Sequence, residues 1–344
     1  KTHIHSFWKE MESVISNQIL LKEKLGFFGI LKEAAKIPFK NPSFIIFTSL
    51  TLLPLLYSLS IYESMFTQTI IEASKVLKEE AEAEAKMEHD CLFCFNWSSL
   101  VQWRHVIDLD HFLGRVSQKL VILVLSHIGI LHLCDLFSTI ATVNSSSELL
   151  YDRHKAESSL KEMFTKHLMD ARLKGPLITS IYTMLFASVS SMGLCSLFLY
   201  VYVISAIFTW FIIIIFLIMF ITVLGKYLEW LAVWDMGVVI SILEEKEGDV
   251  AIVISSYLSR GSRRSGILLI VGFLLWRVCL RVMYVFLALN GGGSRIWVLV
   301  VQVLLFGFTN VFKWVCFVVY YFDCKKRRSN KEVPRIEGDG VYSV

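Results

Sequence analysis

The sequence predicts an all-α membrane protein, a polytopic bundle of about six transmembrane helices, and two observations lead to this fold class. First, no acidic residue, Lys or Arg occurs between Lys174 and Lys226. A helix crosses the ~30 Å hydrocarbon core of a bilayer in about 20 residues, so this run is long enough for two crossings. Second, 55% of the residues are hydrophobic and only 19% are charged, compared with about 45–50% and about 25% in soluble domains.

Six apolar segments have the length of a membrane span. In chain order they cover residues 43–62, 119–143, 176–200, 205–227, 265–289 and 296–322. Pro54 predicts a kink in the first span, and the Gly-rich segment 290–294 predicts a tight hairpin between the last two. Beyond the fourth span the apolar pattern continues to Leu243, interrupted by Glu229 and Asp235. We expect one long helix that projects beyond the membrane there, rather than a kinked helix at the interface.

The distribution of Lys and Arg predicts the orientation, because cytoplasmic segments carry an excess of these residues. The basic segments are the N-terminal residues 1–42, the inner loops 144–175 and 244–264, and the tail 323–344. The long outer loop, residues 63–118, dilutes its cations with many acidic residues. We therefore expect a transmembrane domain over residues 43–322 with both termini in the cytoplasm, in the endomembrane system or the plasma membrane.

Two amphipathic segments flank the bundle on the expected cytoplasmic side. Residues 25–39 are expected to place their apolar side chains largely on one face (Phe27, Phe28, Ile30, Leu31, Ala34 and Ala35) and their charged side chains on the opposite face (Lys32, Glu33 and Lys36). This pattern is typical of a helix in the headgroup plane. Residues 249–260 behave likewise. Either segment can be an anchor that stiffens the bundle or a lipid sensor. The cations expected to contact anionic lipid are Lys32, Lys36, Arg260, Arg263, Arg264, Lys325, Lys326, Arg327 and Arg328.

Residues 230–270 combine a Trp-containing helix end, a Val-rich stretch, an acidic turn with Gly and a basic stop. The positions that carry this pattern are Trp234, Ser241, Glu244, Gly248, Ser255, Leu258 and Gly261. Together with FFGILKEAAKIPFKNPSFIIFTSLTLLPL near the start and STIATV at the end of the second span, they make the chain resemble a plant family of uncharacterised multi-pass transmembrane proteins, often labelled polyadenylate-binding-protein-binding proteins. The resemblance implies a membrane bundle without a catalytic signature.

The acidic turn and the amphipathic segment after it also show a faint similarity to the membrane domain of some bacterial glycerophosphodiester phosphodiesterases. The 344 residues leave no room for the phosphodiesterase domain beside the six spans. This similarity therefore implies a membrane bundle and not the phosphodiesterase activity.

Ionisable groups inside a membrane are costly, so those within the spans are candidate functional residues. The polar residues in question are His127, His132, Asp135, Arg277, Arg281, Asn310 and Lys313. Asp135 and Lys313 lie at similar depths, counted from the outer ends of their spans, so these two can form an ion pair. We expect a buried polar layer that joins the second, fifth and sixth helices. It serves either to fix helix packing or as a proton or solute path in which Asp135 and His132 exchange protons.

Outside the spans, the candidate modification sites are few. Cys91 and Cys94 form one CxxC pair in the expected outer loop, where a local disulfide or two separate thiols are expected. Asn96 begins an Asn-Trp-Ser acceptor for a glycan, and Cys324, beside a basic cluster, is a candidate for palmitoylation rather than an expected site. The acidic residues 70–90 predict a solvated helix. Neither one CxxC nor three candidate ligands on one helix makes a tetrahedral metal site, so we expect no metal and no cofactor.

The sequence contains no GxSxG, HExxH or phosphate-binding Gly loop. Its basic residues follow the membrane topology rather than a nucleic-acid groove, so no nucleic-acid partner is expected. We therefore expect a non-enzymatic protein that organises membrane lipids or partner proteins. The alternative is a small transporter or channel that uses the polar layer of His132, Asp135, Arg277 and Lys313. A lipid-modifying enzyme is a third interpretation, with no motif in its favour.

Overall fold

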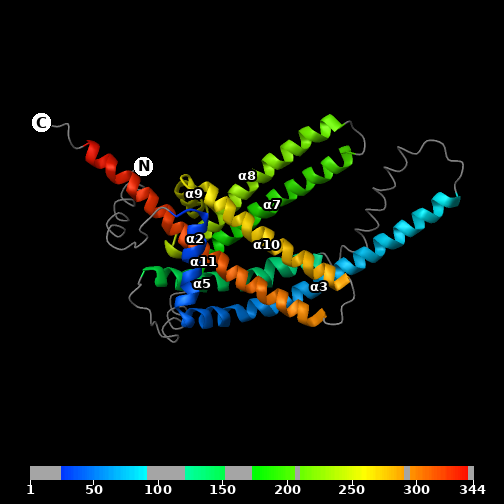
Figure 1. Ribbon diagram of the computed structural model, residues 1–344, viewed down its shortest axis with the longest axis horizontal. Helices are drawn as coiled ribbons and strands as arrows, with labels where there is room; N and C mark the ends of the chain where they lie inside the picture. The colour runs from blue at the N-terminus through cyan, green and yellow to red at the C-terminus, as the bar shows by residue number, and fades with distance from the viewer. Residues whose placement is uncertain (1–24, 91–120, 152–172, 206–209, 290–294, 340–344) are drawn as a thin grey trace. The chain divides into compact units, whose positions relative to one another are not determined.

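The computed structural model describes residues 25–90, 121–151, 173–205, 210–289 and 295–339, and all regular structure within these ranges is helical (Figure 1). The helices are α2 (Phe27–Lys40), α3 (Pro42–Asp90), the π-helix η1 (His127–Leu131), α5 (His132–Tyr151), α7 (Lys174–Ser205), α8 (Trp210–Leu243), α9 (Gly248–Ser259), α10 (Arg263–Leu289) and α11 (Arg295–Asp339). The predicted all-α fold class is confirmed.

Six of these helices contain stretches that are long and apolar enough to cross a membrane. The stretches are Pro42–Glu72, Val121–Leu150, Lys174–Tyr200, Ile214–Leu243, Arg263–Leu287 and Trp297–Arg328. Each overlaps one of the spans expected from the sequence. The protein is therefore a multi-pass membrane protein by the length and composition of its helices.

The first span is longer than expected, because α3 continues without a break past Tyr62 to Asp90. The segment that follows Tyr62 contains no Gly or Pro and is rich in strong helix formers such as Ala, Glu and Lys. The helix therefore extends into the expected outer loop, and Glu63 lies inside the candidate span Pro42–Glu72. The helix expected over residues 70–90 is part of α3.

The chain forms two compact units. Unit 1 comprises residues 1–51, 136–276 and 308–344, and unit 2 comprises residues 52–135 and 277–307. We describe each unit by itself.

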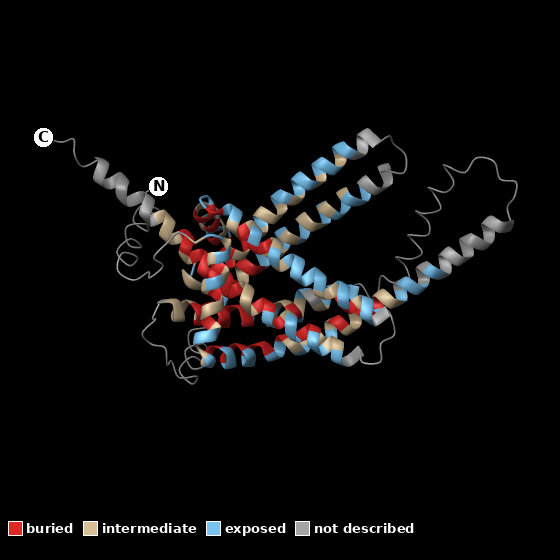
Figure 2. Ribbon diagram, viewed as in Figure 1, coloured by how far each residue is buried: buried red, intermediate tan, exposed pale blue. Residues whose placement is uncertain are grey.

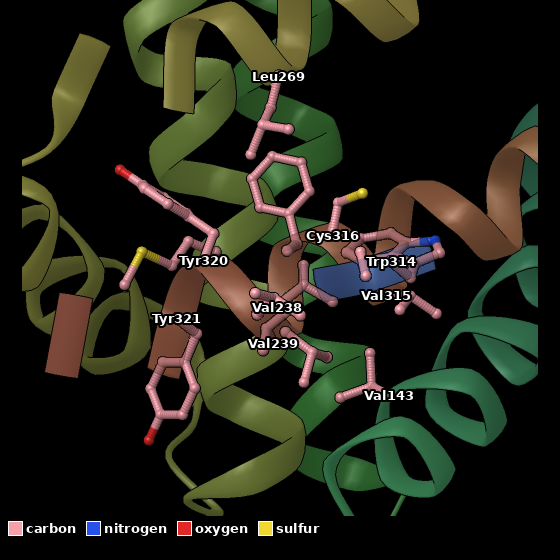
Figure 3. Packing of buried hydrophobic residues seen from close by; sticks show 14 of the residues in the cluster. Val143, Val238, Val239, Leu269, Trp314, Val315, Cys316, Tyr320 and Tyr321 are labelled. Atoms are coloured by element: carbon pink, nitrogen blue, oxygen red, sulfur yellow. The ribbon is translucent and has the colours of Figure 1, made fainter. Parts of the chain in front are cut away.

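The core of unit 1 is built around α11. Every residue from Trp314 to Tyr321 is buried, as expected of a helix that is apolar on all sides. Val238, Val239 and other residues of α8 pack on it (Figure 3), and residues of α2, the start of α3, α5, α9 and α10 belong to the same hydrophobic cluster.

Helix α8 has two halves with different surroundings. Residues 214–223 are mostly exposed, whereas nearly all residues from Ala232 to Ser241 are buried in the unit 1 core (Figure 2). The exposed half is apolar, with Ile215 and Ile218 more than half exposed, so it is the part suited to lipid. The expectation of one continuous helix as far as Leu243 is confirmed.

The amphipathic segments pack differently from our expectation. In α2, Ile30, Ala34 and Ile37 are buried in the protein core, and in α9, Ala251 and Leu258 are buried likewise. The buried face of each helix is thus covered by protein, whereas Phe28, which was expected on the same face of α2, is 80% exposed. Hydrophobic periodicity shows that a face avoids water but does not specify what covers it.

The turn between α8 and α9 fixes the contact of these helices with α7. Gly248 has a φ of 57°, a conformation that favours glycine because it lacks Cβ. Its N–H donates to Thr179 Oγ1 of α7 at 2.9 Å. Two helical turns further into α9, Ser255 Oγ donates to the carbonyl of Val233 on α8 at 2.6 Å. Gly248 and Ser255, two of the positions that carry the family resemblance, therefore have structural roles.

Candidate functional site

A cluster of ion pairs ties the C-terminal part of α11 to its neighbours in unit 1. Lys325 Nζ lies 2.8 Å from Glu244 Oε1 at the end of α8, and Tyr321 donates its hydroxyl hydrogen to the same oxygen. Asp323 accepts from the backbone N–H of Leu25 at 3.1 Å and pairs with Arg327 at 2.7 Å. These contacts join α11 to α8 and to the segment that precedes α2.

Cys324 lies inside this cluster. It is 1% exposed, and its Sγ lies 2.8 Å from Ser262 Oγ. Tyr320 donates its hydroxyl hydrogen to the backbone carbonyl of Ser262 at 3.2 Å. Palmitoylation requires an accessible thiol, and the folded chain buries the thiol of Cys324.

Some of the cations expected to contact lipid interact with neighbouring side chains and others are exposed to solvent, and Arg263 does both. Lys325 and Arg327 form the pairs above, Arg263 lies 2.5 Å from Glu229, Lys36 lies 2.5 Å from Glu33, and Arg328 covers the ring of Tyr257. Those with exposed side chains are Lys32, Arg260, Arg263 and Arg264, while Lys326 is half-buried. Contact with lipid stays a prediction for all nine.

One face of α2 combines aromatic and basic side chains. Phe28 is 80% exposed and Phe39 is 87% exposed, and Lys32 is exposed between them. Residues at these spacings of four and seven lie on one side of a helix, opposite the buried Ile30 and Ala34. We call Phe28, Lys32 and Phe39 the α2 stripe.

A second ion pair lies deeper in unit 1. Lys313 Nζ of α11 is 2.7 Å from Asp235 Oδ2 of α8, with side chains 15% and 20% exposed. The ammonium group also lies 4.5 Å from the centre of the Trp314 ring. The similar depths of Asp135 and Lys313 in their expected spans had predicted Asp135 as the partner of Lys313. The structure gives Asp235 instead, because α8 extends as one helix past the position where a span would end.

Unit 2 contains an ion pair between Glu63 of α3 and Arg281 of α10. The Glu63 side chain is 1% exposed and that of Arg281 is 36% exposed. The guanidinium group also lies over the Phe66 ring, 4.4 Å from its centre. Because a lone charge in a low-dielectric environment is costly, this pair explains how Glu63 lies buried in an apolar helix.

Two further polar side chains lie near the depth of this pair. Leu56 of α3 packs against Gly307 of α11, and Ser58 Oγ of α3 lies 3.5 Å from Cys134 Sγ of α5. Along α3, Glu63 follows Leu56 and Ser58, and along α11 and α5, Gln302 and His132 precede the contact residues Gly307 and Cys134. At a rise of 1.5 Å per residue, Gln302 and His132 therefore lie within about 5 Å of the level of Glu63. We call Glu63, His132, Arg281 and Gln302 the unit 2 polar layer.

This layer contains several polar atoms that are buried and lack a hydrogen-bond partner among the described residues. They are Glu63 Oε2, His132 Nε2, Arg281 Nε and both side-chain polar atoms of Gln302. An unsatisfied polar group in a membrane interior costs several kcal/mol, and ordered water is the usual partner of such groups. The π-helix His127–Leu131 immediately precedes His132, and π-bulges occur frequently at functional sites. The layer therefore has the chemistry of a hydrated site.

The model of one protein family, described as Domain of unknown function (DUF8558), matches residues 20–332. The chain belongs to this family. No curated protein and no solved structure matches it. The residues matched by the DUF8558 model include all six candidate spans, the ion pairs at the C-terminal part of α11 and the unit 2 polar layer.

In this DUF8558 chain the seven residues of the expected layer divide between the units. His127, His132, Asp135, Arg277 and Arg281 belong to unit 2, whereas Asn310 and Lys313 belong to unit 1. Asn310 is 4% exposed. The contacts described above therefore form separate sites, one around Lys313 and one around Arg281.

Sequence reasoning missed Glu63, Asp235, Gln302 and Glu244 as polar residues of these sites. Glu63 follows directly after the expected end of the first span, and Asp235 lies beyond the expected end of the fourth. Gln302 stands within the apolar run IWVLVVQVLLFG, which is a usable signal, because a lone amide in such a run requires a partner.

The remaining predictions concern residues outside the described ranges or a metal. Cys91, Cys94 and Asn96 lie outside the described residues. Among the residues that the structure does describe, no group of three or more His, Cys, Asp or Glu side chains is arranged to hold a metal ion.

Proposed function

We propose that this protein is a non-enzymatic membrane protein that gathers anionic lipids at the cytoplasmic leaflet, with both termini in the cytoplasm. The observation that supports it is the α2 stripe. Two nearly fully exposed Phe side chains are unfavourable in water. Beside a Lys at the membrane surface, they can enter the headgroup region while the ammonium group contacts lipid phosphates.

The exposed cations of the unit 1 core add to this surface. Lys32 of α2, Arg260 after α9 and Arg264 of α10 have exposed side chains. Each Lys or Arg near an anionic leaflet contributes about 1 kcal/mol to lipid attraction. The three together provide a preference for anionic lipid without any enclosed binding site.

The test is lipid enrichment around the reconstituted full chain. The protein is placed in phosphatidylcholine vesicles that contain fluorescent phosphatidylserine, and energy transfer from a dye on the protein reports local enrichment. The triple variant Phe28→Ser, Lys32→Glu, Phe39→Ser is expected to lower the enrichment severalfold. Lys75→Glu is the matched control, since Lys75 is exposed on α3 at the end expected outside. Equal enrichment in the wild type and the triple variant would contradict the proposal.

A second candidate function, a proton or small-ion path, is favoured by the unit 2 polar layer. Its unpartnered buried atoms require water, and chains of water with Glu and His side chains are the usual elements of proton relays. Vesicles that contain the protein and a pH-sensitive dye test this function. Gln302→Leu is expected to abolish proton flux, whereas Val282→Ala on the exposed face of α10 leaves it unchanged. Absence of flux in the wild type removes this candidate.

A further inference from the structure

Helices α7 and α8 run side by side as an antiparallel pair (Figure 1), and a groove of about 810 Å³ lies between them. Ligand pockets typically have volumes of ~300–1,000 Å³. The α7 side of the groove contains Ser190, Gly193 and Ser196, and the α8 side contains Met219, Val223 and Lys226. The α7 side also contributes Leu194, Leu197 and Tyr200, so the groove is mostly apolar, with three small residues on α7 and one cation on α8.

Aromatic contacts explain why the groove is present only over this length. Toward the core, Phe186 of α7 stacks on Trp234 of α8 with ring centres 6.2 Å apart. Further from the core, Tyr200 of α7 meets Phe216 of α8 at 5.6 Å. Large rings hold the helices apart at both places, and the small residues between them leave the space unfilled.

The cationic end of the groove lies where the uncharged run of α8 ends, because residues 175–225 contain no acidic residue, Lys or Arg and Lys226 is the first charge after them. Lys226 Nζ is 3.0 Å from Glu229, and Glu229 also pairs with Arg263 at 2.5 Å. Arg263 is the first residue of α10 and of its candidate span. Trp230, which is 57% exposed, stands beside these charges, as Trp commonly does at membrane interfaces.

The length of the groove corresponds to one leaflet. From Ser190 to Tyr200 the groove follows α7 for ten residues, or about 15 Å at 1.5 Å per residue, which is half of a ~30 Å hydrocarbon core. Measured from its charged end at Lys226, the groove therefore has the length of one leaflet. An acyl chain of a lipid in the leaflet on the side of the unit 1 core has this length and polarity.

Charge at the boundary selects the headgroup. Lys226 and Arg263 share the single carboxylate of Glu229, so the three side chains carry one net positive charge. The Lys226 side chain is 69% exposed and that of Arg263 is 43% exposed. Both can therefore contact a phosphate while the lipid chain occupies the groove.

We infer that the α7–α8 groove is a phospholipid site, which holds one acyl chain between Ser190 and Tyr200 and an anionic headgroup at Lys226 and Arg263. The inference rests on the proposed lipid role and adds to it a defined site with a lipid class.

The test uses the full chain in phosphatidylcholine vesicles that contain phosphatidylserine with a photoactivatable diazirine in its acyl chain. After illumination, mass spectrometry locates the labelled residues. We expect labels on Leu194 and Leu197 of α7 and on Val223 of α8, which line the groove.

Two glycines provide a matched pair of variants. A Cβ added at Gly193 or at Gly225 meets no atom within 4 Å, so neither Gly193→Phe nor Gly225→Phe is expected to disturb folding. Gly193 lines the groove and Gly225 does not. Groove labelling should fall about tenfold in Gly193→Phe, as for a site that loses one decade of affinity, and stay unchanged in Gly225→Phe. Thermal unfolding of both variants confirms that they fold.

Lys226→Gln tests the headgroup. We expect the preference of the groove for labelled phosphatidylserine over labelled phosphatidylcholine to fall about fivefold, the effect of one cation near the surface. Equal labelling of the wild type and Gly193→Phe would show ordinary boundary lipid and overturn the inference. Unchanged headgroup preference in Lys226→Gln would overturn the assignment of an anionic lipid.

Comparing the α2 stripe variant with Gly193→Phe distinguishes failure of this inference from failure of the proposed function. If the stripe variant lowers phosphatidylserine enrichment while Gly193→Phe leaves groove labelling unchanged, the groove inference alone fails. If Gly193→Phe removes the labelling and the stripe variant has no effect, the proposed role of α2 fails and the groove site stands.

Discussion

Lys313 and Asp235 form an ion pair of 2.7 Å between α11 and α8, within the helices that build the core of unit 1. Both side chains are mostly buried, and the neighbouring Trp314 and Val239 are part of the hydrophobic cluster. The pair thus fixes the register of two helices that otherwise meet through apolar contacts, which are tolerant of sliding.

Removing one partner of this pair should destabilise the fold strongly. Asp235→Asn leaves the Lys313 ammonium group without a carboxylate, and breaking a buried pair costs about 3–5 kcal/mol. Thermal unfolding in detergent, followed by intrinsic fluorescence, measures the loss. The double variant Asp235→Asn, Lys313→Met should recover much of it, and Asp249→Asn on the exposed start of α9 serves as control. Additive effects of the two single changes would contradict the pairing.

Gly266 and Gly272 on α10 should respond differently to the same substitution. A Cβ at Gly266 would lie 2.9 Å from the Tyr320 hydroxyl oxygen and 3.3 Å from Ala232 Cβ, so Gly266→Ala should cost about 1–3 kcal/mol through overpacking. A Cβ at Gly272 comes no closer than 4.0 Å to Phe27. Gly272→Ala should therefore be neutral or stabilise the helix by up to ~1 kcal/mol. The two unfolding temperatures decide the comparison, and equal shifts would exclude close packing at Gly266.

In unit 2, Glu63→Gln should lower stability because Arg281 loses its carboxylate partner. The expected cost is about 3–5 kcal/mol. Glu63→Gln combined with Arg281→Gln should restore part of the stability, and Lys75→Gln on the exposed part of α3 is the control. A double variant as unstable as the sum of the single variants would show that the two residues do not depend on each other.

Cys324 should resist a membrane-impermeant maleimide in the folded protein, since its side chain is buried beside Ser262. The measurement uses a variant that retains Cys324 as its single cysteine. Asp323→Ala removes the contacts with Leu25 and Arg327 and should increase the labelling rate, about tenfold for each ~1.4 kcal/mol of lost local stability. Rapid labelling of the intact chain would mean that Cys324 is accessible.

Glycan mapping tests the proposed orientation. Asn96 begins an acceptor sequon in the expected outer loop, and Asn144 begins another at the expected inner end of the second span. A shift in gel mobility on glycosidase treatment, lost in Asn96→Gln and kept in Asn144→Gln, is the expected result. A glycan on Asn144 alone would invert the topology.

Much of the fold follows from local properties of the sequence. The lengths of the apolar runs predict six spans because a bilayer requires about 20 apolar residues for each crossing. The continuity of α8 to Leu243 follows likewise, since the apolar pattern continues to that residue and contains no Pro. The first span does not end at Tyr62 as the charge of Glu63 predicts, because the helix formers that follow favour continuation of α3.

The sites depend on tertiary contacts that single-sequence patterns do not contain. His132 and Arg281 were identified as polar residues in apolar helices, and Gln302 offered the same signal, but the partners Glu63 and Asp235 could not be identified this way. The pairing of a carboxylate with a cation depends on the neighbouring helices and on their register. The periodicity within one helix does not contain this information.

The sequence by itself determined that this chain is a helical, multi-pass membrane protein, because hydrophobic length and charge distribution act through each segment separately. Only the tertiary structure decided that Lys313 pairs with Asp235, that the apolar face of α2 packs in protein while Phe28 and Phe39 remain exposed, and that α7 and α8 enclose a groove. These features arise where side chains from distant segments meet, and their energies depend on the shape and charge of both partners.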